Sequence, residues 1–68
     1  MDKTLKLNNR VKEFRQKLGL SQEDLAKKTS TTRQTIIAVE NGTFNPSAKL
    51  ASLICMVLDK RFEEVFYF

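Results

Sequence analysis

The residues best suited to chemistry in this 68-residue sequence lie in one stretch, TSTTRQTIIAVENG, which runs from Thr29 to Gly42. Four small hydroxyl residues lead directly into Arg33 and Gln34, and then into an apolar run. Hydroxyl oxygens accept hydrogen bonds from the first turn of a helix, and hydroxyl groups also donate to phosphate oxygens. Arginine and glutamine side chains supply several hydrogen-bond donors each. The stretch therefore predicts a polar binding surface beside a packed helix.

Catalysis has little support elsewhere in the sequence. The chain has no histidine, one cysteine, no glycine-rich phosphate loop and no cluster with metal-ligand spacing. Glu63 and Glu64 are adjacent, but neighbouring helical residues point about 100° apart and cannot converge on one bond. We expect no enzyme, no cofactor and no metal. Cys55 is interpreted as interior or interface packing rather than as a redox switch.

Cap signals predict two short helices around the polar stretch. Residues 21–24, SQED, are typical of a capping box, in which a serine hydroxyl accepts a hydrogen bond from a first-turn N–H. Thr31 or Thr32 caps the following helix, and Asn41-Gly42 ends it because glycine readily adopts the left-handed conformation. The hydroxyl run thus forms the turn between two helices.

The second of these helices has two different faces on a helical wheel. One face carries Thr32, Ile36 and Val39, the opposite face carries Gln34, Ile37, Ala38 and Asn41, and Arg33 projects from the first turn. Ile37 is informative, because an apolar residue on an outward face is anomalous in water and reasonable in a groove of a partner.

The flanking sequence predicts three more helices and two terminal strands. Lys3–Leu7 alternates polar and apolar residues, as in a strand with one buried face, and residues 66–68 predict a strand at the other end. Asn8 or Asn9 caps a first helix that Gly19 ends. A fourth helix follows Ser47, with a core face of Leu50, Leu53, Ile54 and Val57. A short fifth helix covers residues 59–65.

Length and charge place limits on the whole chain. Sixty-eight residues make one domain near the lower limit for a single hydrophobic core, so a subunit partner is expected. Residues 1–50 hold ten basic and five acidic residues, whereas residues 51–68 hold two and three, so the first part is the expected polyanion surface. The longest apolar run, residues 53–58, is too short to span a bilayer, and we expect a cytoplasmic protein.

Residues 20–47, LSQEDLAKKTSTTRQTIIAVENGTFNPS, resemble the helix-turn-helix of the Xre/Cro-like phage-repressor family. The match continues outward to RVKEFRQKLG and LASLICMVLD, and covers about residues 8–65. The resemblance implies an all-α fold, with residues 1–68 forming a compact five-helix repressor-like DNA-binding domain. It places the helix-turn-helix at about 21–41, with the third helix in the major groove. Short family members often end in a paired strand, which suits a small two-stranded sheet between the chain ends.

Two positions depart from the family pattern. Ser30 stands where the family usually has glycine in the turn between helices two and three, so this serine either accepts a positive φ or bends the turn differently. Arg61 stands where the family commonly has a helix-capping serine or threonine. The last helix therefore begins raggedly or takes Asp59 as its cap.

The resemblance also implies the residues that contact DNA. By family position, the base-reading residues are Arg33, Gln34, Ile37 and Ala38. Arginine pairs with guanine, glutamine with adenine, and isoleucine or alanine with a thymine methyl group. The phosphate-binding residues that the resemblance implies are Gln22, Thr32, Thr43, Asn45 and Ser47. Family members further suggest a partly buried ion pair between Arg15 and Glu40.

The C-terminal part, about residues 52–68, predicts a dimer interface, because it holds more apolar surface than so small a chain can cover alone. The expected interface residues are Met56, Phe62, Phe66, Tyr67 and Phe68. We expect the Leu5–Leu7 strand to pair with Phe66–Phe68.

The sequence therefore predicts a sequence-specific DNA-binding transcriptional regulator, a repressor that binds a palindromic operator as a homodimer. The alternative is a protein-interaction module, either the DNA-binding antitoxin of a toxin pair or a bridging coactivator. An adaptor would bind its protein partner without needing the Arg33-Gln34 face. An antitoxin gene would lie beside a toxin gene.

Overall fold

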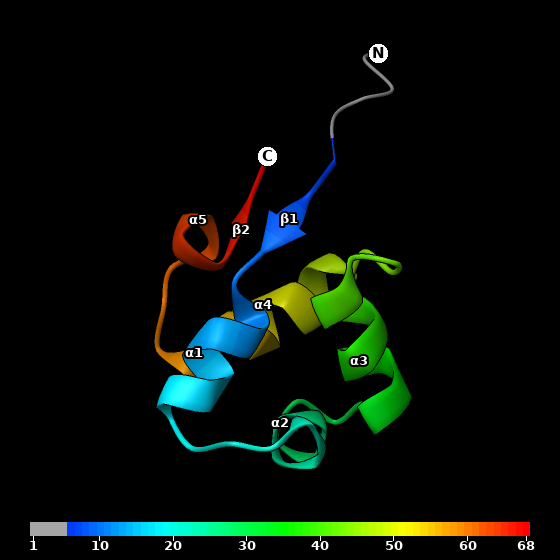
Figure 1. The fold of residues 1–68 in the computed structure, drawn as a ribbon, viewed down its shortest axis with the longest axis vertical. Helices are drawn as coiled ribbons and strands as arrows, with labels where there is room; N and C mark the ends of the chain where they lie inside the picture. The colour runs from blue at the N-terminus through cyan, green and yellow to red at the C-terminus, as the bar shows by residue number, and fades with distance from the viewer. Residues whose placement is uncertain (1–5) are drawn as a thin grey trace.

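The computed structural model describes residues 6–68, and within them five helices pack beside one two-stranded antiparallel sheet (Figure 1). The elements in chain order are β1 (Asn8–Asn9), α1 (Val11–Lys17), α2 (Gln22–Lys28), α3 (Arg33–Asn41), α4 (Ala48–Leu58), α5 (Phe62–Val65) and β2 (Phe66–Tyr67). The fold is mostly helical, as the sequence predicts. In Figure 1, α3 lies at one side of the molecule and α5 at the other.

The predicted cap residues define the helix starts around the turn. The Ser21 hydroxyl accepts from the Asp24 N–H at 2.9 Å, and the Asp24 carboxylate accepts from the Ser21 N–H at 2.9 Å, which completes a capping box. Thr32 caps α3, because its hydroxyl accepts from the Thr35 N–H. At the far end of α3, Gly42 has a φ of 78°, in the left-handed region that glycine tolerates.

Ser30 accepts the strained conformation in the turn between α2 and α3. Its φ is 58°, which is uncommon for a residue with a Cβ atom. The next residue, Thr31, donates its N–H to the Ala26 carbonyl oxygen at 2.9 Å, which closes the end of α2 around the left-handed residue. The turn therefore keeps its glycine-type geometry without a glycine.

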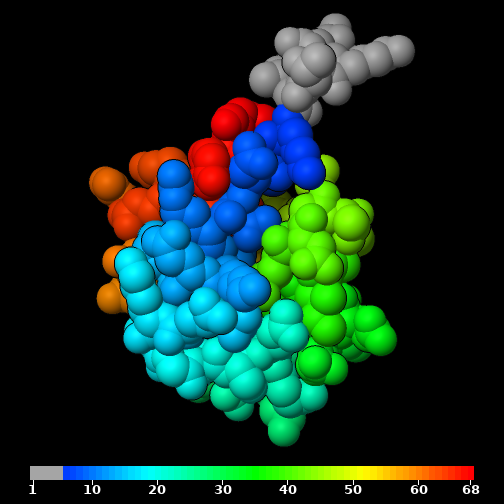
Figure 2. Space-filling model, viewed as in Figure 1, coloured from blue at the N-terminus to red at the C-terminus, as the bar shows by residue number. Residues whose placement is uncertain are grey.

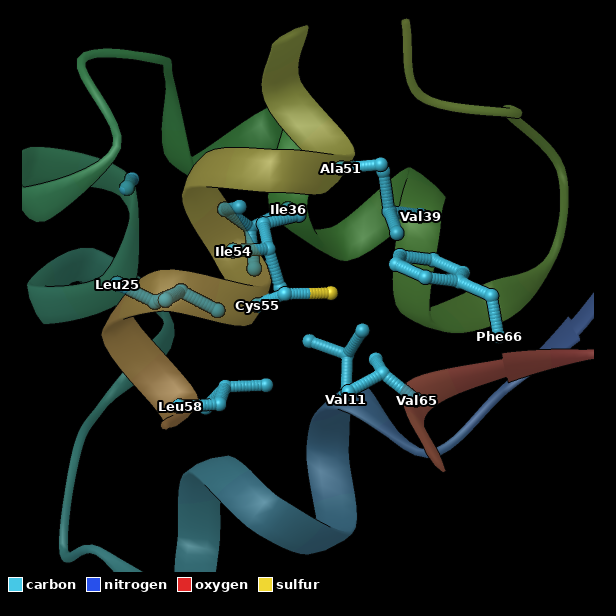
Figure 3. Close-up of a cluster of buried hydrophobic side chains, with 11 residues drawn as sticks. Val11, Leu25, Ile36, Val39, Ala51, Ile54, Cys55, Leu58, Val65 and Phe66 are labelled. Atoms are coloured by element: carbon cyan, nitrogen blue, oxygen red, sulfur yellow. The ribbon is translucent and has the colours of Figure 1, made fainter. Parts of the chain in front are cut away.

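The buried face of α4 differs from the predicted one. Ala51, Ile54, Cys55 and Leu58 are buried, whereas Leu50, Leu53 and Val57 are only half-buried. Cys55 belongs to the buried apolar cluster, which also holds Val11 of α1 and Phe66 of β2 (Figure 3). Burial raises the pKa of its thiol, as expected for interior packing.

The start of α5 matches one of the two expectations for this helix. Asp59 does not cap α5; it ends α4 in the left-handed conformation, with a φ of 56°. Arg61 occupies the position before α5 and makes no side-chain cap hydrogen bond. The helix therefore begins without a cap and is only one turn long, at Phe62–Val65, shorter than predicted.

The two-stranded sheet forms later in the chain than predicted. Asn8 pairs with Tyr67 and Asn9 with Phe66, so the expected Leu5–Leu7 strand is wrong for residues 6 and 7, and Leu5 lies outside the described residues. The backbone N–H of Arg10 donates to the Val65 carbonyl oxygen at 2.8 Å. This hydrogen bond joins the residue directly before α1 to the last residue of α5. Both ends of the described chain lie at this sheet (Figure 1).

One apolar cluster holds the helices together (Figure 3). Its buried members come from every helix and from β2: Val11, Leu25, Ala26, Ile36, Val39, Ala51, Ile54, Cys55, Leu58, Val65 and Phe66. In α3 only Ile36 and Val39 belong to this cluster, whereas Arg33 and Gln34 in the first turn are exposed.

Candidate nucleic-acid interface

The side of α3 that faces away from the core carries the four predicted base-reading residues. Ile36 and Val39 are buried on the inner side. Arg33 and Gln34 are exposed, whereas Ile37 and Ala38 are half-buried. In the space-filling view the surface of α3 forms the right-hand edge of the molecule (Figure 2). This face therefore has two exposed polar side chains in the first turn of α3 and two half-buried apolar side chains in the next turn.

The hydroxyl run before α3 divides its tasks between packing and capping. Thr29 is buried, and its hydroxyl donates to the Leu25 carbonyl oxygen at 2.8 Å. Thr32 is exposed, accepts from the Thr35 N–H, and shares a hydrogen bond of 3.0 Å with the Thr35 hydroxyl. The sequence therefore changes abruptly from polar to apolar because the hydroxyl groups form the hydrogen bonds of the turn, and the helix that follows has one buried face.

The structure brings Arg15 and Glu40 together, and it adds Gln22. Nε of Arg15 lies 2.7 Å from Oε2 of Glu40, and a second guanidinium nitrogen lies 3.1 Å from Oε1. The two side chains are only 8% and 3% exposed. Nε2 of Gln22 also donates to Oε1 of Glu40, at 3.1 Å. One carboxylate at the end of α3 thus joins α1, α2 and α3.

The predicted phosphate-binding residues surround α3 but differ in what they can still donate. Ser47 caps α4 by accepting from the Leu50 N–H at 3.1 Å, so its hydroxyl proton stays available. Asn45 is exposed in the loop before α4. The Thr43 hydroxyl donates to the Ala38 carbonyl oxygen at 3.2 Å, and its backbone N–H donates to the same oxygen. Thr43 can contact a phosphate only after that hydroxyl turns away.

Exposed lysines lie on three of the other helices, α1, α2 and α4. They include Lys12, Lys27, Lys28 and Lys49. At the start of α2, hydrogen bonds from the backbone and then the hydroxyl of Ser21 lower the pKa of Asp24, so that its carboxylate stays charged at the end of the helix where negative charge is favourable.

The C-terminal part carries an exposed apolar surface, with one correction to the predicted set. Met56 is 74% exposed, Phe62 52% and Phe68 75%, and Tyr67 is also exposed. Phe66 is wrong as an interface residue, because it is 3% exposed and packs in the core of its own chain. Successive strand residues point to opposite faces, so Phe66 points inward and Tyr67 outward. We use the term C-terminal apolar surface for Met56, Phe62, Tyr67 and Phe68.

Sequence reasoning missed two contacts near this site. Gln22 gave no signal of its link to Glu40, since the two lie 18 residues apart and one is neutral. Asn9 was expected only as a cap, yet its amide nitrogen also donates to the Val39 carbonyl oxygen in α3, at 2.9 Å. Local patterns do not report such contacts because they depend on how distant elements pack.

Neither a membrane span nor a metal site is found in the part of the chain that the structure describes. None of the helices in residues 6–68 has the length and apolar character needed to cross a bilayer. No group of three or more potential metal ligands occurs within the same residues.

Two helices joined by a tight turn, with the second helix projecting from a small helical core, define a helix-turn-helix domain. Residues 11–65 match the family described as Helix-turn-helix. The chain is 45% identical over 62 residues to an HTH-type transcriptional regulator of Archaeoglobus fulgidus, which covers 91% of this chain and 89% of the relative. It is 43% identical over 61 residues to the HTH-type transcriptional regulator YgzD of Bacillus subtilis. That match covers 90% of this chain and 92% of the relative. The chain belongs to the Xre/Cro-like helix-turn-helix family of DNA-binding transcriptional regulators.

Solved structures have the same fold. The restriction-modification controller protein C.AhdI from Aeromonas hydrophila superposes with a TM-score of 0.76 at 34% identity, over 81% of this chain and 83% of that one. The clp gene regulator ClgR from Corynebacterium glutamicum superposes with a TM-score of 0.73 at 21% identity, over 76% of this chain and 55% of that one. The second similarity concerns the fold alone.

Proposed function

We propose that this chain is a transcriptional repressor that occupies an inverted-repeat operator as a homodimer, with one α3 in each of two successive major grooves. The observation that carries the proposal is the two-sided character of α3. Its inner side is anchored by Ile36 and Val39, and its outer side presents Arg33 and Gln34 to solvent. A helix of this width fits the major groove of B-form DNA. Repression then needs only occupancy, since a bound dimer excludes other proteins from the same DNA.

The side chains on the outer side have the donor patterns that base reading requires. Arginine donates two parallel hydrogen bonds to guanine, and the glutamine amide pairs with the edge of adenine. Ile37 and Ala38 provide an apolar surface that suits a thymine methyl group. Each good bidentate pair discriminates against a wrong base by about 1–3 kcal/mol. A few such pairs therefore account for selection of one DNA sequence.

Phosphate contacts position α3 on the duplex in this proposal. Gln22, Thr32, Asn45 and Ser47 supply neutral donors at the edges of the helix, and Thr43 joins them once its hydroxyl turns away from the Ala38 carbonyl oxygen. Such contacts fix register and orientation and carry no direct sequence information. The exposed lysines add attraction that weakens as salt rises, because bound cations on the DNA are released.

Dimerisation in this proposal uses the C-terminal apolar surface. Burying Met56, Phe62 and Phe68 against the same residues of a second copy removes exposed apolar area from water. Residues 51–68 hold two basic and three acidic residues, so two copies meet there with little charge repulsion. The surface lies away from α3, since α5 and α3 occupy opposite sides of the molecule (Figure 1). Both surfaces can therefore act at the same time.

Selection of bound duplexes from a random DNA pool tests the proposal, with footprinting of the winners at two salt concentrations. We expect one enriched inverted repeat whose half-site centres lie about 10 bp apart, which is one helical turn. The footprint should persist at the higher salt on the selected sequence and disappear from unrelated DNA, because nonspecific binding is almost entirely electrostatic. Recovery of a pool with no enriched sequence would contradict the proposal.

A further inference from the structure

Asn9 lies at a junction of three elements. Its side-chain oxygen accepts from the Val11 N–H at 3.1 Å, at the start of α1. Its side-chain nitrogen donates to the Val39 carbonyl oxygen at 2.9 Å, in the last turn of α3. Its backbone belongs to β1, opposite Phe66 of β2. One half-buried amide therefore joins the sheet, the first helix and the third helix.

The residues beside Asn9 hold β1 in the same place. The Arg10 N–H donates to the Val65 carbonyl oxygen at 2.8 Å, which fixes β1 to the end of α5. The side chain of Lys6 lies close to Gly42, the residue that ends α3. A Cβ atom placed on Gly42 would lie 3.3 Å from the Cε atom of Lys6. The strand thus runs along the C-terminal end of α3 on one side and pairs with β2 on the other.

Capping alone does not explain an asparagine at this position. A cap needs only an acceptor for the Val11 N–H, and aspartate or serine supplies one equally well. The contact with Val39 needs a donor as well, and an amide side chain offers both within one rigid group. The Val39 carbonyl oxygen already accepts from the Gly42 N–H at 3.0 Å. The Asn9 contact is therefore an additional connection between elements and not a repair of an unpaired carbonyl group.

We propose that Asn9 is a positioning residue that fixes α3 relative to the sheet, and so relative to the proposed dimer surface that includes Tyr67 of β2 and the next residue, Phe68. The inference rests on the proposed homodimer on an inverted repeat. When one half of such a dimer is bound, the second α3 meets its groove at an effective concentration that depends on how rigidly the two helices are held. Loosening the Asn9 contact lowers that concentration without removing any base contact.

The test compares binding of one protein to two DNA duplexes, the selected inverted repeat and a duplex that holds a single half-site. Asn9→Asp keeps the acceptor for Val11 and removes the donor to Val39. Asn8→Asp is the matched control, because it adds the same charge one residue away, where the asparagine amide donates only to the Lys6 carbonyl oxygen. Asn9→Ser provides a second variant that also keeps an acceptor and adds no charge. Circular dichroism and sedimentation establish that each protein is folded and dimeric at the concentrations used.

We expect the wild-type protein and Asn8→Asp to prefer the full repeat over the half-site by the same ratio. Asn9→Asp and Asn9→Ser should bind the half-site as the wild type does and lose about fivefold or more of that preference, the lower end of typical coupling between sites. Equal loss on both duplexes, which a merely structural role would produce, overturns the inference, as does an unchanged ratio. If the wild-type protein itself shows no preference for the repeat, the proposed function fails first, and the inference with it.

Discussion

At the scale of single residues, the carboxylate of Glu40 connects α3 to the two helices that precede it. It accepts two hydrogen bonds from Arg15 and one from Gln22, so α1, α2 and α3 meet at one buried charge. A third guanidinium nitrogen atom of Arg15 donates to the Leu20 carbonyl oxygen at 2.8 Å. Each of the three guanidinium nitrogen atoms of Arg15 therefore has a hydrogen-bond acceptor. Such additional hydrogen bonds are the condition under which a buried ion pair is tolerated.

Removal of either partner of this pair should be strongly destabilising. We predict that Arg15→Ala and Glu40→Ala each lower the free energy of unfolding by about 3–5 kcal/mol, because each leaves a desolvated charge without its partner. Total stabilities of small domains start at about 5 kcal/mol, so both variants should be largely unfolded at moderate urea concentrations. Urea unfolding followed by circular dichroism measures the difference.

A matched control for the ion pair is present in the same helix. Glu13 and Lys17 form an exposed pair at 3.5 Å, and such pairs contribute about 0–1 kcal/mol. Glu13→Ala should therefore leave the urea midpoint almost unchanged. If Arg15→Ala and Glu40→Ala behave as mildly as Glu13→Ala, the pair does not support α3.

At the scale of elements, the turn between α2 and α3 contains backbone strain at Ser30, a position where glycine would be unstrained. Ser30 adopts a φ of 58°, in the left-handed region where a Cβ atom costs about 1–2 kcal/mol. The surrounding hydrogen bonds impose this conformation, since α2 and α3 must leave the turn at the angle that buries Leu25 and Ile36 together. The serine thus accepts strain while α3 keeps its place against α2.

Replacement of Ser30 by glycine should stabilise the protein. We predict that Ser30→Gly raises the free energy of unfolding by about 0.5–1 kcal/mol, because the relief of strain exceeds the extra freedom that glycine gives the unfolded chain. For a domain of this size that is a rise in Tm of a few degrees. Ser30→Ala is the control, because alanine keeps the Cβ atom and should bring no such gain. Equal Tm values for the two variants would show that backbone strain at this position is negligible.

At the scale of the whole molecule, most of the positive charge and most of the exposed large apolar side chains come from different parts of the chain. Residues 1–50 supply most of the positive charge, and residues 51–68 supply Met56, Phe62 and Phe68. In the proposed function, DNA and a second copy therefore contact different parts of the molecule. This division would allow the proposed dimer to bind a duplex without competition between the two contacts.

The C-terminal apolar surface gives a direct prediction about assembly. Wild-type protein should sediment as a dimer at about 10–50 μM, a range well above a micromolar dissociation constant. Met56→Glu should sediment as a monomer, because two charges would be buried near each other across the two-fold axis. Phe44→Glu is the control, since Phe44 is exposed and lies in the loop before α4. A wild-type monomer, or a Phe44→Glu monomer, would contradict this interface.

The starts of α2, α3 and α4 could be predicted from the sequence because caps are local. Ser21, Thr32 and Ser47 each accept from an N–H three residues on, so a few adjacent letters suffice. The position of β1 was not predictable in this way, whereas β2 lies within the predicted residues 66–68. Asn8 and Asn9 pair with β2, which directly follows α5, so their pairing depends on where α5 ends in space. No local sequence pattern indicates that position.

The packing of side chains shows the same limit. Cys55 and Phe66 are buried whereas Leu53 and Phe62 are not, and hydrophobicity alone could not rank these residues. For the candidate site, the resemblance implied the Arg15–Glu40 pair, which the structure brings together. The roles of Arg33 and Gln34 stay predictions, because base contacts need the partner to be seen.

The central claim is that Arg33 and Gln34 read bases while the residues around α3 position the protein. Selection from a random DNA pool with Arg33→Ala and Gln34→Ala, compared with Asn45→Ala as a positioning control, tests it most directly. We predict that each of the first two variants, shown to be folded, loses about 1–3 kcal/mol of discrimination at one or two base pairs of the half-site. Asn45→Ala should bind all sequences more weakly and select the wild-type operator unchanged. Selection of the wild-type operator with unchanged base preferences by folded Arg33→Ala and Gln34→Ala proteins would contradict the account.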